Sequence, residues 1–194
     1  ARHTGHSDYG HALRKPEILR VFMFVFCISF LYHGVHKWYG VYLSEIYRFD
    51  QLTINMFVVG TVVMGMIGQM TGGYLSDIKG RGFATRLGVV GLSLSVMLLL
   101  GVYAKWMLAI VLGLIAFFWT IGHNGISTIL TDFADDDRPV IAGLNSSVRF
   151  ISGGLGFILS KPFVNMNFGK TFFVFGVMLF MLSWVVSRVL PEGS

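Results

Sequence analysis

Six stretches of mostly apolar residues, each long enough to cross a bilayer, constrain this chain more than any other feature. A membrane-spanning helix needs about 20 predominantly apolar residues, because the hydrocarbon core is about 30 Å thick. The stretches that meet this requirement are residues 18–42, 54–75, 84–104, 106–130, 139–159 and 171–189. The sequence therefore predicts an all-α membrane protein with six transmembrane helices.

The composition supports lipid as the solvent for most of the surface. Of the 194 residues 54% are hydrophobic and 13% charged, whereas a soluble domain carries roughly 25% charged residues. Mean hydropathy is +0.68. The net charge of +5 could indicate a nucleic-acid binder. The basic residues lie at the ends of the apolar stretches, however, so lipid headgroups explain them better and no nucleic-acid partner is expected.

Short connections predict that neighbouring helices run antiparallel, and an even number of spans places both chain ends on one side. Lys and Arg are enriched on the cytoplasmic side of membrane proteins. One side carries nine of these residues: Arg2, Arg14, Lys15, Arg20, Lys79, Arg81, Arg86, Arg138 and Arg188. The other carries four: Arg48, Lys105, Lys161 and Lys170. We therefore expect residues 1–17 and 191–194 in the cytoplasm and a bundle over residues 18–190 in the plasma (inner) membrane.

A charged segment between the second and third stretches, Gly-Tyr-Leu-Ser-Asp-Ile-Lys-Gly-Arg at residues 73–81, predicts a short turn broken by glycine. This GxLSDxxGR pattern resembles the signature loop of the major facilitator superfamily of secondary transporters. Residues 14–16 (Arg-Lys-Pro), 42–43 (Tyr-Leu) and 138–147 follow in family order, and the last resembles the drug and metabolite exporters. The resemblance covers nearly the whole chain. It implies two inverted three-helix repeats that form one six-helix bundle, half of the usual twelve-helix transporter.

The sequence also departs from the family pattern. Ile78 and Gly82 stand where the family favours basic residues, and the fourth span lacks the arginine common in N-terminal halves. The fifth span lacks the glycine-proline antiporter motif and closes with Ser-Lys-Pro at residues 160–162. These differences make the chain resemble a C-terminal half, and they weaken an expectation of proton-driven antiport.

The resemblance implies that Gly73, Asp77, Gly80 and Arg81 form a conformational latch. Gly73 and Gly80 would permit close packing and a tight turn. In the family, the equivalent Asp meets a helix end of the opposite half in one conformation, where the positive end of the helix dipole favours it. If two copies pair, Asp77 would lie near the partner's Arg138. The alternative is that the charged residues only anchor the loop among headgroups.

Glycines recur on two helix faces, at residues 65, 68 and 72 of the second span and at residues 153 and 156 of the fifth. Small residues at these intervals let helices approach closely in lipid. The interiors of the third and sixth spans hold no ionisable residue, as expected of helices that face lipid. The first, fourth and fifth spans carry the polar groups. In the family, the first, second, fourth and fifth spans line the central cavity.

Ionisable residues at bilayer depth mark functional sites by default. His33, His36 and Lys37 share one face of the first span, where they could bind a solute or anchor the outer interface. His123 and Asn124 lie in the fourth span, the counterpart of the first in an inverted repeat. A packing role remains open for His123. A metal site is not expected, because no carboxylate or thiol shares these faces.

Arg149 is the strongest substrate-binding candidate. It lies about 15 Å from the start of the fifth span, near the midplane, with Asn145 one turn earlier on the same face. A central arginine suggests binding of a carboxylate, a phosphate or another anion. The alternative is a structural hydrogen bond to helix-end carbonyls. Because no Asp or Glu lies mid-span, proton coupling would require a histidine or a partner's carboxylate.

The resulting hypothesis is half of a secondary transporter that moves a small organic solute, anionic or amphipathic, by alternating access. It would pair with a second six-helix bundle, as a homodimer or with a missing N-terminal half. The alternative is a non-transporting membrane protein that binds a partner or regulates it. An enzyme and a cofactor are not expected, because the chain has no Ser-His-Asp arrangement, HExxH motif, phosphate loop or paired carboxylates within a span.

Overall fold

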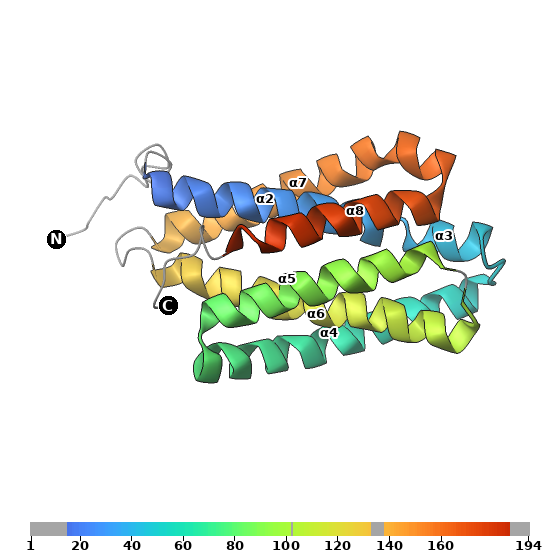
Figure 1. The fold of residues 1–194 in the computed structure, drawn as a ribbon, viewed down its shortest axis with the longest axis horizontal. Coiled ribbons are helices and arrows are strands. Elements are labelled where there is room, and N and C mark those ends of the chain that lie inside the picture. Colours follow the sequence, from blue (N-terminus) through green and yellow to red (C-terminus); the bar gives the residue numbers. More distant parts are fainter. Residues whose placement is uncertain (1–14, 102, 133–137, 187–194) are drawn as a thin grey trace.

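A computed structural model of the protein describes residues 15–101, 103–132 and 138–186, and every regular element within them is helical. Six long helices run alternately up and down along the bundle (Figure 1). They are α2 (Pro16–His36), α4 (Gln51–Lys79), α5 (Arg81–Met97), α6 (Lys105–Asp132), α7 (Arg138–Met166) and α8 (Phe168–Ser183). Two short helices, α3 (Tyr39–Glu45) and η1 (Leu98–Leu100), follow α2 and α5. The all-α fold predicted from the sequence is confirmed.

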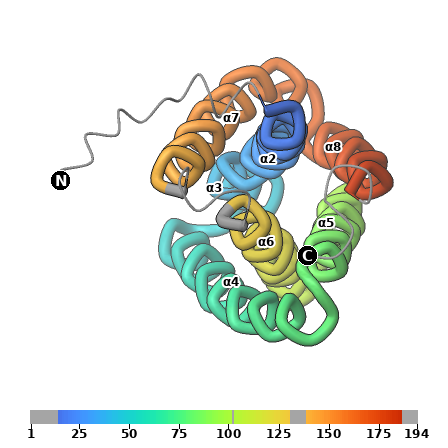
Figure 2. The backbone as a smooth tube through the Cα atoms, turned by 90° about the vertical axis from the view of Figure 1, so that its left-hand side faces the viewer, coloured from blue at the N-terminus to red at the C-terminus, as the bar shows by residue number. Residues whose placement is uncertain are grey.

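The helices form a bundle whose two halves have matching contacts. In Figure 2, α2 and α6 lie at the centre, α4 and α7 flank one side of them, and α5 and α8 pack together on the other. The contact between α6 and α4 corresponds to the contact between α2 and α7. The contact between α6 and α5 corresponds to the one between α2 and α8, which is less extensive. Exchanging the first three long helices for the last three thus reproduces the arrangement. This is the expected pair of inverted repeats.

Within the part of the chain that the structure describes, four helical segments have the length and composition to cross a membrane: Pro16–Glu45, Gln51–Lys79, Arg81–Leu100 and Lys105–Leu130. The helix α7 has the length, at 29 residues, but carries Arg149 and Lys161 among its apolar residues. The helix α8 is apolar but has 16 residues, which at 1.5 Å per residue span about 24 Å.

The first predicted span is not one continuous helix. The helix α2 ends at His36, and a turn separates it from α3. The amide of Trp38 donates to the carbonyl of Val35, a tighter closure than an α-helical turn. The indole Nε1 of Trp38 donates to Ser160 Oγ of α7 at 2.8 Å. This side-chain contact holds the turn against the bundle at what we call the α3 end.

The predicted charged turn at residues 73–81 is also mostly helix, which corrects the sequence-based expectation. The helix α4 continues through Lys79, and α5 begins at Arg81, so Gly80 alone lies between them. Gly80 has φ 87°, ψ 155°, a conformation that glycine adopts without the steric cost of a Cβ. One glycine therefore reverses the chain, and the rest of the motif forms the last turns of α4.

Glycines bring helix backbones together at several places, three of which show the closest approaches. A Cβ on Gly68 would collide with the backbone of Phe117 on α6, and one on Gly156 with the carbonyl oxygen of Phe30 on α2. A Cβ on Gly88 of α5 would collide with the backbone of Gly122 on α6. Close approach of this kind gives van der Waals contact, which drives helix association in lipid.

Replacing Gly88 with Ala should destabilise the bundle by roughly 1–3 kcal/mol, the usual cost of overpacking. The matched control is Gly60→Ala in α4, where no atom lies within 4 Å of the added methyl group. This control should be neutral or slightly stabilising, because Ala favours helix more than Gly. Thermal unfolding in mild detergent measures both. Equal stability of the two variants would contradict the packing account.

Candidate functional site

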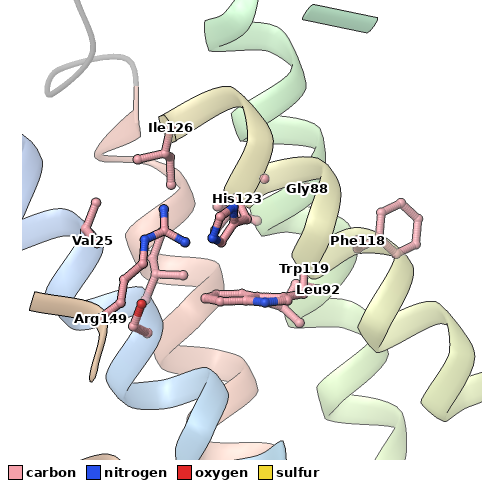
Figure 3. A pocket seen from close by; sticks show the side chains of 12 residues that line it. Val25, Gly88, Leu92, Phe118, Trp119, His123, Ile126 and Arg149 are labelled. Carbon is pink, nitrogen blue, oxygen red and sulfur yellow. The ribbon is translucent and has the colours of Figure 1, made fainter. Parts of the chain in front are cut away.

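A small cavity lies between α2, α5, α6 and α7, near the middle of the bundle. Its lining includes the polar side chains of Arg149, His123 and Ser29 and the aromatic rings of Trp119 and Phe118. In Figure 3, Arg149 and His123 point toward one another across the cavity, with the Trp119 ring beside them. The cavity has a volume of about 10 Å³, which is about the space of one water molecule. The bundle by itself therefore holds no room for an organic solute at this point.

The guanidinium of Arg149 is held by two neutral side chains. Its Nε donates to Asn145 Oδ1 at 2.9 Å, and a terminal nitrogen donates to Ser127 Oγ at 3.3 Å. Ser127 Oγ in turn lies 3.4 Å from His123 Nδ1. This chain of contacts links α7 to α6 and fixes the position of Arg149. Its observed partners are side chains and not helix-end carbonyls, and neither of them neutralises the positive charge.

Trp119 of α6 is the centre of an aromatic cluster. Its ring stacks on Tyr32 of α2 with centroids 3.8 Å apart and planes 4° from parallel. His33 and His123 approach the Trp119 ring at steep angles, with centroids 5.7 and 5.9 Å away. The His36 ring stacks on Tyr32, with ring centroids 5.1 Å apart. The histidines of the two central helices are thus brought together by one tryptophan.

A larger groove lies on the open face between α2, α4 and α6, beside this cluster. It has a volume of about 360 Å³ and includes Tyr32, His36, Gln69, Trp119 and Thr120 in its lining. The Nδ1 atom of His36 is buried and has no hydrogen-bond partner among the described residues. The Tyr32 and Trp119 rings line this groove, and Trp119 also lines the small cavity, so the stacked pair lies between the two spaces.

Three of the candidate substrate-binding residues line neither the small cavity nor the groove. His33 donates from Nδ1 to the carbonyl of Ser29 in its own helix at 2.8 Å while its ring faces Trp119. Lys37 is exposed in the turn after α2, away from both spaces. Asn124 donates to the carbonyl of Gln69 on α4 at 3.3 Å, so it joins two helices and lies on a different face from His123.

The candidate latch residues lie together at the end of the bundle opposite α3. Asp77 is exposed on the last turns of α4, and Arg81 begins α5. A Cβ on Gly73 would lie 3.4 Å from the side-chain nitrogen of Asn124, an ordinary contact. Arg138 begins α7 at the same end (Figure 1). Whether these residues act as a latch depends on a second bundle.

Sequence reasoning missed Trp119, Tyr32 and Ser127. Trp119 and Ser127 each lie four residues from His123, and Tyr32 lies four residues from His36. Residues four apart share a helix face, so this spacing could have identified all three. The large number of aromatic residues concealed the signal, because most of them pack in the core or face lipid.

The residues described in the structure include no group of three or more His, Cys, Asp or Glu side chains placed to hold a metal ion.

The family model of the major facilitator superfamily matches residues 2–157. The chain belongs to this superfamily. It is therefore an integral membrane protein, in agreement with its apolar helices.

Among curated proteins, the chain is similar to the cis,cis-muconate transport protein of Acinetobacter baylyi, with 26% identity over 161 residues. The matched region covers 77% of this chain and 38% of that protein. The chain thus spans well under two thirds of the length of the relative it matches. No solved structure matches the chain.

The contact between Arg149 and Asn145 is testable by a double-mutant cycle. Asn145→Ala should lower the free energy of unfolding by about 1.5–3 kcal/mol, because a hydrogen bond to a charged group contributes this much. In an Arg149→Met background the same change should cost much less. Ser147→Ala is the control, since its hydroxyl bonds only to the carbonyl of Gly143 in its own helix. An equal cost in both backgrounds would show that the two side chains are not coupled.

Proposed function

We propose that the chain is half of a secondary transporter that moves a small organic anion by alternating access. The observation that carries this proposal is the distribution of polar groups across the bundle. Arg149, His33, His36 and His123 all lie on α2, α6 and α7, around the stacked Trp119 and Tyr32 rings or in the two spaces that these rings separate. The helices α5 and α8, on the opposite side, present no ionisable side chain beyond their first two turns. One side is suited to a solute and the other to lipid.

The flanking helices supply a surface on which a second bundle can pack. In the spanning part of α4, 28% of the residues are buried, and the buried positions form a single stripe against α6. The helix α7 exposes Gly143, Ser147 and Gly154 at intervals of about one or two turns, and no atom lies within 4 Å of a Cβ built on Gly154. Exposed small residues permit close approach of another helix. The partner would be an identical copy or an N-terminal half.

A second bundle on this side would complete the solute cavity. The groove of about 360 Å³ is at the low end of the range for small-molecule sites, and it lacks one wall. The Trp119 and Tyr32 rings supply this groove with flat apolar surfaces. Arg149 supplies a fixed positive charge for a carboxylate in the small cavity on the other side of that stacked pair. The muconate transport relative supports testing a dicarboxylate first. Both chain ends would face the cytoplasm, and Asp77 would contact the second bundle in one state of the cycle.

Uptake of radiolabelled cis,cis-muconate and of a panel of smaller and aromatic carboxylates into proteoliposomes tests the proposal. Arg149→Ala should reduce the uptake of an accepted anion at least tenfold, because a charged hydrogen bond contributes about 1.5–3 kcal/mol. The matched control is Arg20→Ala, an exposed arginine near the start of α2, which should leave uptake unchanged.

The outcome also separates the two functional classes. Equal uptake by the Arg149→Ala variant would remove this residue from the solute site. If a correctly folded protein moved none of the anions, alone or together with an N-terminal half, the result would favour a non-transporting partner protein.

A further inference from the structure

A long apolar trough runs between α7 and α8 over Phe30 of α2 and continues between α2 and α8, on a different side of the bundle from the polar cluster. Its wider part, near the α3 end, has a volume of about 900 Å³ and is walled by Phe30, Phe163, Val174, Phe175 and Met178. A second part of about 400 Å³ continues toward the opposite end past Cys27 and Val185. Both parts share Phe30 and Met178, so they form one continuous surface feature.

The trough exists because the second repeat packs more loosely than the first. In the first repeat, α5 reaches α6 by direct backbone contact at Gly88 and Gly122. At the corresponding contact of the second repeat, the Phe175 ring of α8 fills the space beside Gly34 of α2. The ring keeps the two backbones apart. The helices α7 and α8 also pack little against each other, and the wider part of the trough lies between them.

One charge lies at the mouth of the trough. Lys170 is the single ionisable side chain among the residues that line the wider part, all of which the structure describes. It is exposed on the first turn of α8, and its amide donates to Asn167 Oδ1 at 2.9 Å, which fixes the backbone there. From Lys170 to Met178 the helix rises about 12 Å. This is close to the roughly 15 Å of hydrocarbon in one leaflet of a bilayer.

We propose that this trough is a binding site for an anionic glycerophospholipid. One acyl chain lies along α8 between Phe30, Phe163 and Val174, and the headgroup phosphate contacts the Lys170 ammonium. The dimensions and the position of the cation match a molecule with an apolar tail and a negative head. The retained lipid fills the space that the looser packing of α8 leaves. This proposal is independent of solute transport, because none of its residues belongs to the polar cluster.

Native mass spectrometry of the protein, released from micelles that contain equal amounts of phosphatidylglycerol and phosphatidylcholine with identical acyl chains, tests this site. The unaltered protein should retain phosphatidylglycerol about fivefold over phosphatidylcholine, as expected for one lysine near an anionic lipid. This first measurement needs no variant. Equal retention of the two lipids, or a lipid-free dimer that covers the trough, would overturn the proposal.

Two pairs of variants locate the site. Lys170→Ala should abolish the preference for phosphatidylglycerol, whereas Lys105→Ala, at the same end of the bundle but outside the trough, should keep it. Val174→Trp fills the trough and should lower the amount of both lipids retained. Leu94→Trp on α5, where the side chain is exposed to a similar extent, should not. A preference that survives Lys170→Ala places the headgroup elsewhere and contradicts the assignment.

Discussion

In a hydrocarbon solvent helices do not gain by burying apolar side chains, so close backbone approach becomes the main source of attraction between them. The bundle depends on this constraint. Gly68, Gly88 and Gly156 each allow a neighbouring backbone to come close, and together they tie α6 to α4 and α5 and tie α2 to α7. The two central helices then lie where their polar side chains can meet.

The polar cluster follows from that arrangement. Arg149 is costly to place in lipid, yet it is fixed by Asn145 and Ser127 and faces the histidine of the neighbouring helix. The small cavity holds about one water, and the adjoining groove is open on one side. We propose that a second bundle closes this groove. The trough beside α8 shows the opposite case, where a gap faces lipid and lipid can fill it.

Most of the fold was predictable, because the lengths of the apolar runs and the glycine spacing report directly on spans and on helix packing. The face that carries His33, His123 and Arg149 was predictable for the same reason. The details that failed depend on tertiary contacts. The break after His36 is held by the bond from Trp38 to Ser160, which is distant in the sequence, and the signature motif forms helix because Gly80 alone makes the turn. Trp119 was missed because aromatic residues are frequent throughout the chain.

The most direct test of the central claim is whether the face flanked by α4 and α7 borders water at mid-membrane depth. Single cysteines at Gln69 on α4 and at Leu94 on α5, in a Cys27→Ser background, both lie within about 8 Å of the middle of their helices. A hydrophilic thiol reagent, which reacts with the ionised thiol in water, is applied to the protein in its native membrane. The account predicts reaction at position 69 and none at position 94. Equal protection of both positions would show that this face meets lipid or a dry interface and does not line a solute cavity.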